Sequence, residues 1–93
     1  MTLLLKDPAA VLDYSIDWGA EYLGDDLIAN SEWSVSPVES GGVSVAGSDF
    51  DAKVSTVKAA GGRAGHVYRL VNIVTTGSGR SDSRSIVLRV EKR

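Results

Sequence analysis

The sequence predicts an all-β fold, an antiparallel immunoglobulin-like β-sandwich of six to seven short strands. Twelve valines, four isoleucines and four threonines make the chain rich in residues that favour strands. Ten glycines and twelve serines divide the apolar stretches into short pieces, as residues that favour turns do. No stretch repeats apolar residues at the helical spacing over three turns. Several short strands separated by turns are typical of a sandwich.

The first expected strand of the sandwich covers Leu12–Trp18. Its even-numbered residues are apolar and its odd-numbered residues are polar, so we expect one buried face and one solvated face. Residues 19–26 form the expected connection to a second strand. This strand covers Leu27–Val35 and places Trp33 on its buried face.

Two short strands are expected in the middle of the chain, after the breaks at Pro37 and at residues 41–42. The first lies around Val43–Val45 and ends before Gly47. The second lies around Phe50–Thr56 and ends at a loop over residues 59–62, which contains only alanine and glycine.

The last third of the chain contains the clearest strand signals. His66–Thr75 is a nearly continuous run of strand-forming residues, which predicts a strand buried on both faces. Within it, Tyr68 follows a turn of small residues as in a tyrosine corner, and we expect its ring in the core with that of Trp33. Residues 76–80 predict a hairpin loop. The final strand is expected at Ser83–Glu91, with its alternate residues Ile86, Leu88 and Val90 facing inward.

One sandwich domain is expected over residues 11–93, preceded by an N-terminal arm over residues 1–10. The 93 residues suit a single domain, and 43% apolar residues are enough for one core. The chain has no cysteine, which excludes disulfides and thiol chemistry. The arm contains Leu3, Leu4 and Leu5. We expect it either to lie along its own sheet edge or to pair with another subunit.

Charge is distributed unevenly along the chain. Residues 1–51 contain ten acidic residues and one basic residue, whereas residues 52–93 contain nine basic and two acidic residues. One interpretation is that the halves interleave and neutralise each other; the other is a polar molecule with unlike ends that stacks on copies or partners. A nucleic-acid partner is not expected, because the acidic half repels phosphate. The apolar run at residues 3–5 is too short for an export signal or a membrane helix, so we expect a soluble chain without membrane contact that stays where it is made.

The sequence contains no group of residues that predicts a catalytic site or a cofactor-binding site. His66 is the single histidine; no Gly-x-Ser-x-Gly nucleophile accompanies it, and we expect it at an exposed strand edge. Asp13 and Asp17 share a strand face roughly 13 Å apart, farther than the carboxylate pairs of glycosidases. The glycine-rich loops lack the Gly-Lys-Ser/Thr ending of a nucleotide loop. The sequence therefore predicts a protein that is not an enzyme.

Contact with partners is the function class that remains. Calcium binding by the carboxylates at residues 25–26 or 49–51 is left open as an alternative. Neither loop fits a known calcium-loop pattern, so no metal site is expected. The candidate contact residues are the leucines of the arm, the aromatic residues that flank the first connection, and two arginines near the last hairpin. They are Leu3, Leu4, Leu5, Trp18, Tyr22, Arg80 and Arg84. Trp18 and Tyr22 either form an exposed hot spot or cap one end of the sandwich.

Three stretches of the sequence carry a family resemblance. The first runs from Lys6-Asp7-Pro8 to Trp18, and the second from Gly24-Asp25-Asp26 to Val35. The third runs from Tyr68 through Asn72 to Gly79-Arg80, followed by Arg84-Ser85-Ile86. Together they resemble a family of small virion proteins of tailed bacteriophages, often described as fiber–tail adaptor proteins.

The resemblance implies an immunoglobulin-like structural protein of a virion, made in the host bacterial cytoplasm. It implies that such a protein attaches fibers or other parts to the tail or neck, with other virion proteins and copies of itself as partners. A capsid decoration protein is the alternative on the same fold, and copy number in the particle separates the two. A carbohydrate-binding module is a further alternative, for which only Trp18 and Tyr22 offer exposed aromatic side chains.

Overall fold

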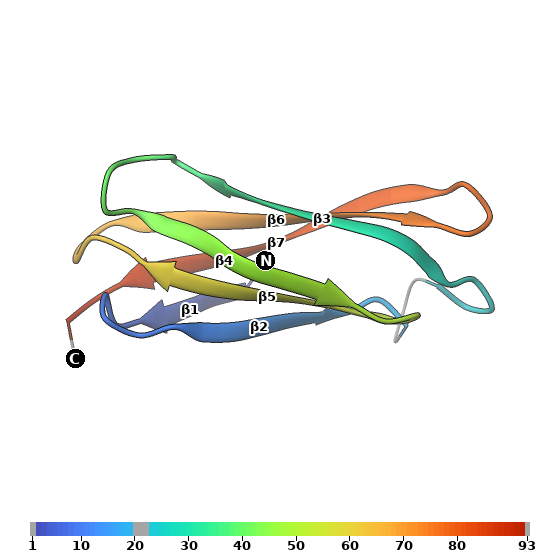
Figure 1. The fold of residues 1–93 in the computed structure, drawn as a ribbon, viewed down its shortest axis with the longest axis horizontal. Coiled ribbons are helices and arrows are strands. Elements are labelled where there is room, and N and C mark those ends of the chain that lie inside the picture. The colour runs from blue at the N-terminus through green and yellow to red at the C-terminus, as the bar shows by residue number, and fades with distance from the viewer. Residues whose placement is uncertain (1, 20–22, 93) are drawn as a thin grey trace.

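Seven strands in two sheets make up the chain in a computed structural model that describes residues 2–19 and 23–92 (Figure 1). The strands are β1 (Thr2–Lys6), β2 (Leu12–Asp17), β3 (Ile28–Ser36), β4 (Val43–Phe50), β5 (Val54–Gly61), β6 (Val67–Thr76) and β7 (Ser81–Val90). The described residues form no helix, so the predicted all-β class is confirmed. In particular, no helix in this part of the chain is long and apolar enough to cross a membrane.

One sheet has four strands in the order β1-β7-β6-β3, and the other has three in the order β2-β5-β4. Every pair is antiparallel except β1 and β7, which run in the same direction. All pairs within residues 11–93 are therefore antiparallel, as predicted for the sandwich, and the parallel strand β1 lies in the predicted arm. The orders β2-β5-β4 and β7-β6-β3 correspond to B-E-D and G-F-C of an immunoglobulin domain. Beyond this order, the immunoglobulin-like label stays a prediction.

The middle strands differ from the expected ones. β4 does not end before Gly47: Ala46 is the extra residue of a bulge, Gly47 pairs with Lys58, and the strand continues to Phe50. The turn to β5 follows at residues 51–53. There the Asp51 carboxylate accepts hydrogen bonds from the backbone N–H groups of Lys53 and Val54, each at 2.8 Å. Phe50 therefore ends one strand instead of beginning the next.

The longest strands, β6 and β7, are each buried on one face. In β6 the even-numbered residues from Tyr68 to Thr76 are buried, whereas Val67 and Ile73 are 48% and 42% exposed. The expectation of burial on both faces is wrong, because no second layer of the described chain covers the outer face of the four-stranded sheet. In β7 the alternate residues Ile86, Leu88 and Val90 are buried, as expected.

The core consists of two apolar clusters. The larger cluster contains Val43, Val57, Ala59, Tyr68, Leu70, Ile86, Leu88 and Val90, and the smaller contains Trp18, Leu23, Ile28 and Val74. Trp33 is partly buried against the larger cluster.

A polar network links the two sheets inside the sandwich. Trp18 Nε1 donates to Asn72 Oδ1 at 2.9 Å, and Asn72 Nδ2 donates to Ser31 Oγ at 2.9 Å. Ser31 and Ser55 share a hydrogen bond of 2.6 Å, and Trp33 Nε1 donates to Ser55 Oγ at 2.9 Å. Because buried polar groups that are paired fix how elements fit together, this network fixes β3 and β6 against β5.

Two polar anchors hold the end of the sandwich near β1. The fully buried Lys6 donates from Nζ to the carbonyl oxygens of Asp7, Ala10 and Gly61, at 2.9, 2.6 and 2.6 Å. Burial lowers the pKa of Lys6, although the Asp7 carboxylate acts in the opposite direction. Tyr68 forms the second anchor: its hydroxyl accepts from the Arg63 backbone N–H at 3.1 Å, as a tyrosine corner does.

Candidate functional site

The outer face of the four-stranded sheet carries exposed apolar side chains. Odd-numbered residues of β6 and β7 point away from the core, because their even-numbered neighbours face it. On this side Leu5, Val67 and Ile73 are 52%, 48% and 42% exposed. Val71 and Val87 are half-buried beside them. We call these five residues the outer apolar face.

Arginine residues lie among the side chains of the outer apolar face. Arg89 is the strand neighbour of both Leu5 and Val67. Arg69 lies across from Val87. Apolar side chains with interspersed arginine are common in protein interfaces, and large exposed apolar patches mark interaction sites. This surface is therefore suited to contact with another protein.

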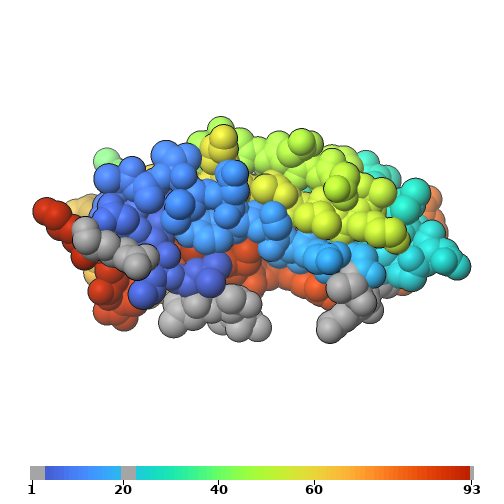
Figure 2. All heavy atoms as spheres, turned by 90° about the horizontal axis from the view of Figure 1, so that it is seen from below, coloured from blue at the N-terminus to red at the C-terminus, as the bar shows by residue number. Residues whose placement is uncertain are grey.

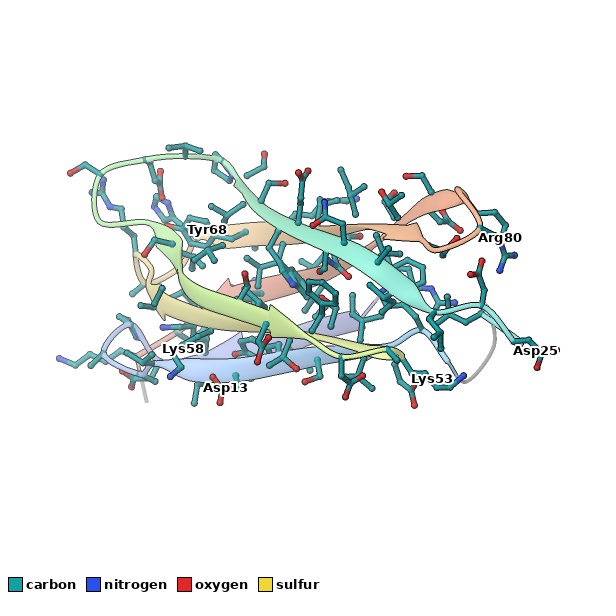
Figure 3. All side chains as sticks on the ribbon, turned by 45° about the vertical axis from the view of Figure 1, so that its right-hand side comes forward. Asp13, Asp25, Lys53, Lys58, Tyr68 and Arg80 are labelled. Carbon is teal, nitrogen blue, oxygen red and sulfur yellow. The ribbon has the colours of Figure 1, made fainter. Side chains whose placement is uncertain are left out.

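The outer face of the three-stranded sheet has the opposite character. Asp13 and Asp17 on β2 and Asp49 on β4 are exposed. Lys58 lies across from Asp13 (Figure 3). One outer face of the sandwich thus carries apolar side chains with arginines and the exposed Glu32, which lies across from Ile73, and the other is polar and mostly acidic.

The acidic and basic halves of the sequence also meet directly inside the fold. Asp26 Oδ2 lies 3.1 Å from Arg80 Nη2, and Glu39 Oε1 lies 2.9 Å from Nδ1 of His66. His66 is exposed, as expected. The interpretation that the halves interleave and neutralise each other is therefore supported at Asp26 and Arg80, while the two outer faces keep unlike chemistry.

A hollow of about 680 Å³ opens between β2 of one sheet and β1 and β7 of the other. Figure 2 looks onto this side of the molecule, where β2 in blue runs next to β7 in orange-red. The residues that line the hollow are Leu4, Asp13, Tyr14, Ser15, Ile16, Arg84, Ser85 and Ile86. We call it the edge hollow.

Tyr14 lines the edge hollow and carries a buried polar atom. Its hydroxyl oxygen is buried and has no hydrogen-bond partner in the part of the chain that the structure describes. Burial raises the pKa of this phenol, so the hydroxyl is neutral and able to donate a hydrogen bond at ordinary pH.

The position of Trp18 contradicts the prediction that this residue forms an exposed hot spot. Its side chain is fully buried, so it offers no hot-spot surface. The guanidinium of Arg84 lies over its ring, 4.6 Å from the centroid, a cation–π contact. The carbohydrate-binding alternative loses this stacking residue, and Tyr22 lies outside the described residues.

Arg80 lies at the tip of the β6–β7 hairpin and forms hydrogen bonds with the segment that precedes β3. Its Nε and Nη2 donate to Asp26 Oδ2 at 3.2 and 3.1 Å, and Nη2 also donates to the Leu23 carbonyl at 3.3 Å. The pKa of Asp26 is strongly lowered, first by the hydrogen bond from the Ser78 hydroxyl and then by Thr76 and Arg80 among other donors. The contacts of Arg80 therefore stabilise the fold, and its contact with a partner stays a prediction.

The leucines of the arm separate onto two faces of β1. Leu4 packs against the larger core cluster, and Leu5 belongs to the outer apolar face. For Leu3 the structure describes the backbone position, across from Val87. Of the two expectations for the arm, the structure shows the one in which it lies along its own sheet edge.

Sequence reasoning missed Tyr14, Val67, Val71 and Ile73 as surface candidates. The continuous apolar run of β6 fits a strand buried on both faces and equally a strand with one uncovered apolar face, so the run alone does not separate the two. Among residues 2–19 and 23–92, no group of three or more histidine, aspartate or glutamate side chains is placed to hold a metal ion.

Comparison with models of protein families gives a match. The family model described as podophage GP4 fiber-tail adaptor protein gp77 matches residues 6–89. No curated protein matches the chain.

Proposed function

We propose, because this chain belongs to the podophage GP4 fiber-tail adaptor family, that it is a non-enzymatic structural protein that joins fibers or other parts to the phage tail or neck. Membership in this family makes the chain a virion component in contact with other virion proteins. We further propose that it is made in the host bacterial cytoplasm and acts through protein–protein contacts alone.

The observation that carries this proposal is the uncovered face of β6. Val67 and Ile73 are about half exposed on β6, an inner strand of the four-stranded sheet, although burial of such side chains is favourable by about 1.5–3 kcal/mol each when complete. A complex in which a second protein covers the outer apolar face is stabilised by part of this free energy. We therefore assign the main attachment surface to this face.

An adaptor needs two different partners, and the sandwich offers two different faces. The acidic outer face with Asp13, Asp17 and Asp49 is unsuited to the partner that covers the outer apolar face, because burial of unpaired carboxylates is costly. We propose that the acidic face turns toward a second component with basic groups. Charge of this kind contributes more to orientation and to the rate of association than to affinity.

The proposal is tested by counting copies of the chain in purified virions. We expect a small, fixed number per particle, and we expect Ile73→Lys to reduce it at least tenfold while the isolated variant folds normally. The matched control Ser40→Lys places the same charge on an exposed position of the loop between β3 and β4, outside the two sheets, and is expected to leave the number unchanged. A chain present in lysate but never in particles contradicts the proposal, and hundreds of copies per particle indicate capsid decoration instead.

A further inference from the structure

The edge of β7 is only half covered by the described chain. β1 pairs with β7 from Ile86 to Val90, and the pairing begins with Thr2 across from Ile86. On that side, Ser81–Arg84 have no strand partner among the described residues. Backbone N–H and C=O groups on a free edge are a template for another strand. Within residues 2–19 and 23–92, the edge of β7 at Ser81–Arg84 is therefore open to a strand in line with β1.

The edge hollow lies directly beside the uncovered part of β7. Arg84 and Ser85 of β7 form one wall, and β2 forms the other wall as the edge strand of the second sheet. Leu4, Ile16 and Ile86 supply its apolar surface. Its volume of about 680 Å³ is within the range of roughly 300–1,000 Å³ that is usual for ligand sites.

Two of the residues that line the edge hollow, Tyr14 and Arg84, carry hydrogen-bond donors. The buried Tyr14 hydroxyl has no partner. No carboxylate in the described chain forms an ion pair with Arg84, whose guanidinium is held over the Trp18 ring. Asp13 also lines the hollow, but its strand neighbour is Lys58 on the outer face. A hydroxyl and a guanidinium together are donors that suit a carboxylate.

We propose that the edge hollow binds an extended acidic segment of another protein, which adds a strand to β7 along Ser81–Arg84 and places a carboxylate at Arg84 and Tyr14. Strand addition of this kind obtains affinity from backbone hydrogen bonds and specificity from alternate side chains. Because alternate residues of a strand face the same side, the segment carries an apolar residue two positions from the acidic one. This inference deepens the proposed function and rests on it for the partner, another virion protein.

The test uses the isolated full chain and a synthetic nine-residue peptide. The peptide alternates threonine and valine, with one glutamate in place of the central valine, and its control has glutamine instead. We expect the glutamate peptide to bind at least fivefold more tightly than the glutamine peptide in a titration followed by NMR. The backbone amide signals of Ser81–Arg84 are expected to shift most.

Single substitutions assign the binding to the proposed donors. Arg84→Gln and Tyr14→Phe are each expected to weaken binding of the glutamate peptide at least fivefold, with unchanged thermal unfolding of Tyr14→Phe as evidence that the fold is intact. Arg63→Gln, the same substitution in an exposed loop, is expected to have no effect.

Several outcomes overturn the inference. They are equal binding of the two peptides, no binding, shifts confined to other strands, or self-association of the free chain that Arg84→Gln abolishes, which makes a second copy the occupant. Each of these results is independent of the virion count. Failure of strand addition is therefore distinguishable from failure of the adaptor function.

Discussion

The ammonium group of Lys6 donates a hydrogen bond to the carbonyl oxygen of Gly61, 2.6 Å away, across 55 positions of sequence. This bond joins the end of β1 in one sheet to the end of β5 in the other. The same ammonium also bonds two carbonyl oxygens of the segment that follows β1. One buried cation thus joins the first strand to both layers of the sandwich.

Replacement of this cation is expected to destabilise the whole domain. Lys6→Met keeps the aliphatic stem and leaves three carbonyl oxygens without their donor, so we expect the free energy of unfolding to fall by about 3 kcal/mol. Urea denaturation of the purified protein measures the loss. Lys58→Met, at an exposed lysine, is the matched control and is expected to change stability by less than about 0.5 kcal/mol. Equal effects of the two substitutions contradict the role given to Lys6.

The polar network inside the sandwich predicts a cost for a very small change. Ser55→Ala removes one oxygen and leaves Trp33 Nε1 and Ser31 Oγ without their shared partner. We expect a loss of about 1–3 kcal/mol, the usual cost of an unpaired buried polar group. Thermal unfolding by circular dichroism measures it, with Ser48→Ala at an exposed position as control. A melting temperature equal to that of the control argues against the network.

Asp26 predicts a dependence of stability on acid pH. Hydrogen bonds from Ser78, Thr76 and Arg80 lower its pKa far below the ordinary value of 3.8. A carboxyl whose pKa is lowered by folding stabilises the folded state fully above its unfolded pKa, and this stabilisation is lost as the pH falls from about 4 toward the lowered value. We therefore expect Asp26→Asn to be less stable than the parent near pH 6, with a difference that shrinks below about pH 4. Asp25→Asn is the control, and a gap that stays constant down to about pH 2 contradicts the prediction.

Two tyrosines offer a matched pair of hydroxyl deletions. The Tyr68 hydroxyl donates to the Glu39 carboxylate and accepts from the Arg63 N–H, whereas the Tyr14 hydroxyl has no partner. We expect Tyr68→Phe to lose about 1–3 kcal/mol of unfolding free energy, and Tyr14→Phe to be neutral or slightly stabilising. Denaturant titration of both variants measures the change in unfolding free energy. The opposite order of stability means that the hydrogen bonds are assigned to the wrong tyrosine.

Alternation in the sequence predicted local burial well where one face of a strand meets the core. The inward set Ile86, Leu88 and Val90 is buried as expected, because a period of two leaves no other face for the apolar residues. The same alternation placed Trp18 on the inward side of its strand. The expectation of exposure came from its flanking connection, and the alternation was the better guide.

The uncovered surfaces could not be predicted, because they depend on contacts between distant segments. Whether Val67 and Ile73 are buried depends on a second layer over the sheet, and no local pattern reports that layer. The edge hollow depends on where β1 begins to pair along β7, at Thr2 and Ile86. That register joins residues from the two ends of the chain, and the composition of neither segment determines it.

The parallel course of β1 and β7 has a mechanical consequence for a part that carries load. Thr2 lies beside Ile86, and Lys6 lies beside Val90, so a force applied between Thr2 and Val90 in opposite directions slides one strand along the other. The bonds between the two strands are then loaded in shear and must break together, whereas strands peeled from one end lose their bonds one at a time. The module therefore resists a force applied between these two residues more strongly than a force that peels the two strands apart from one end.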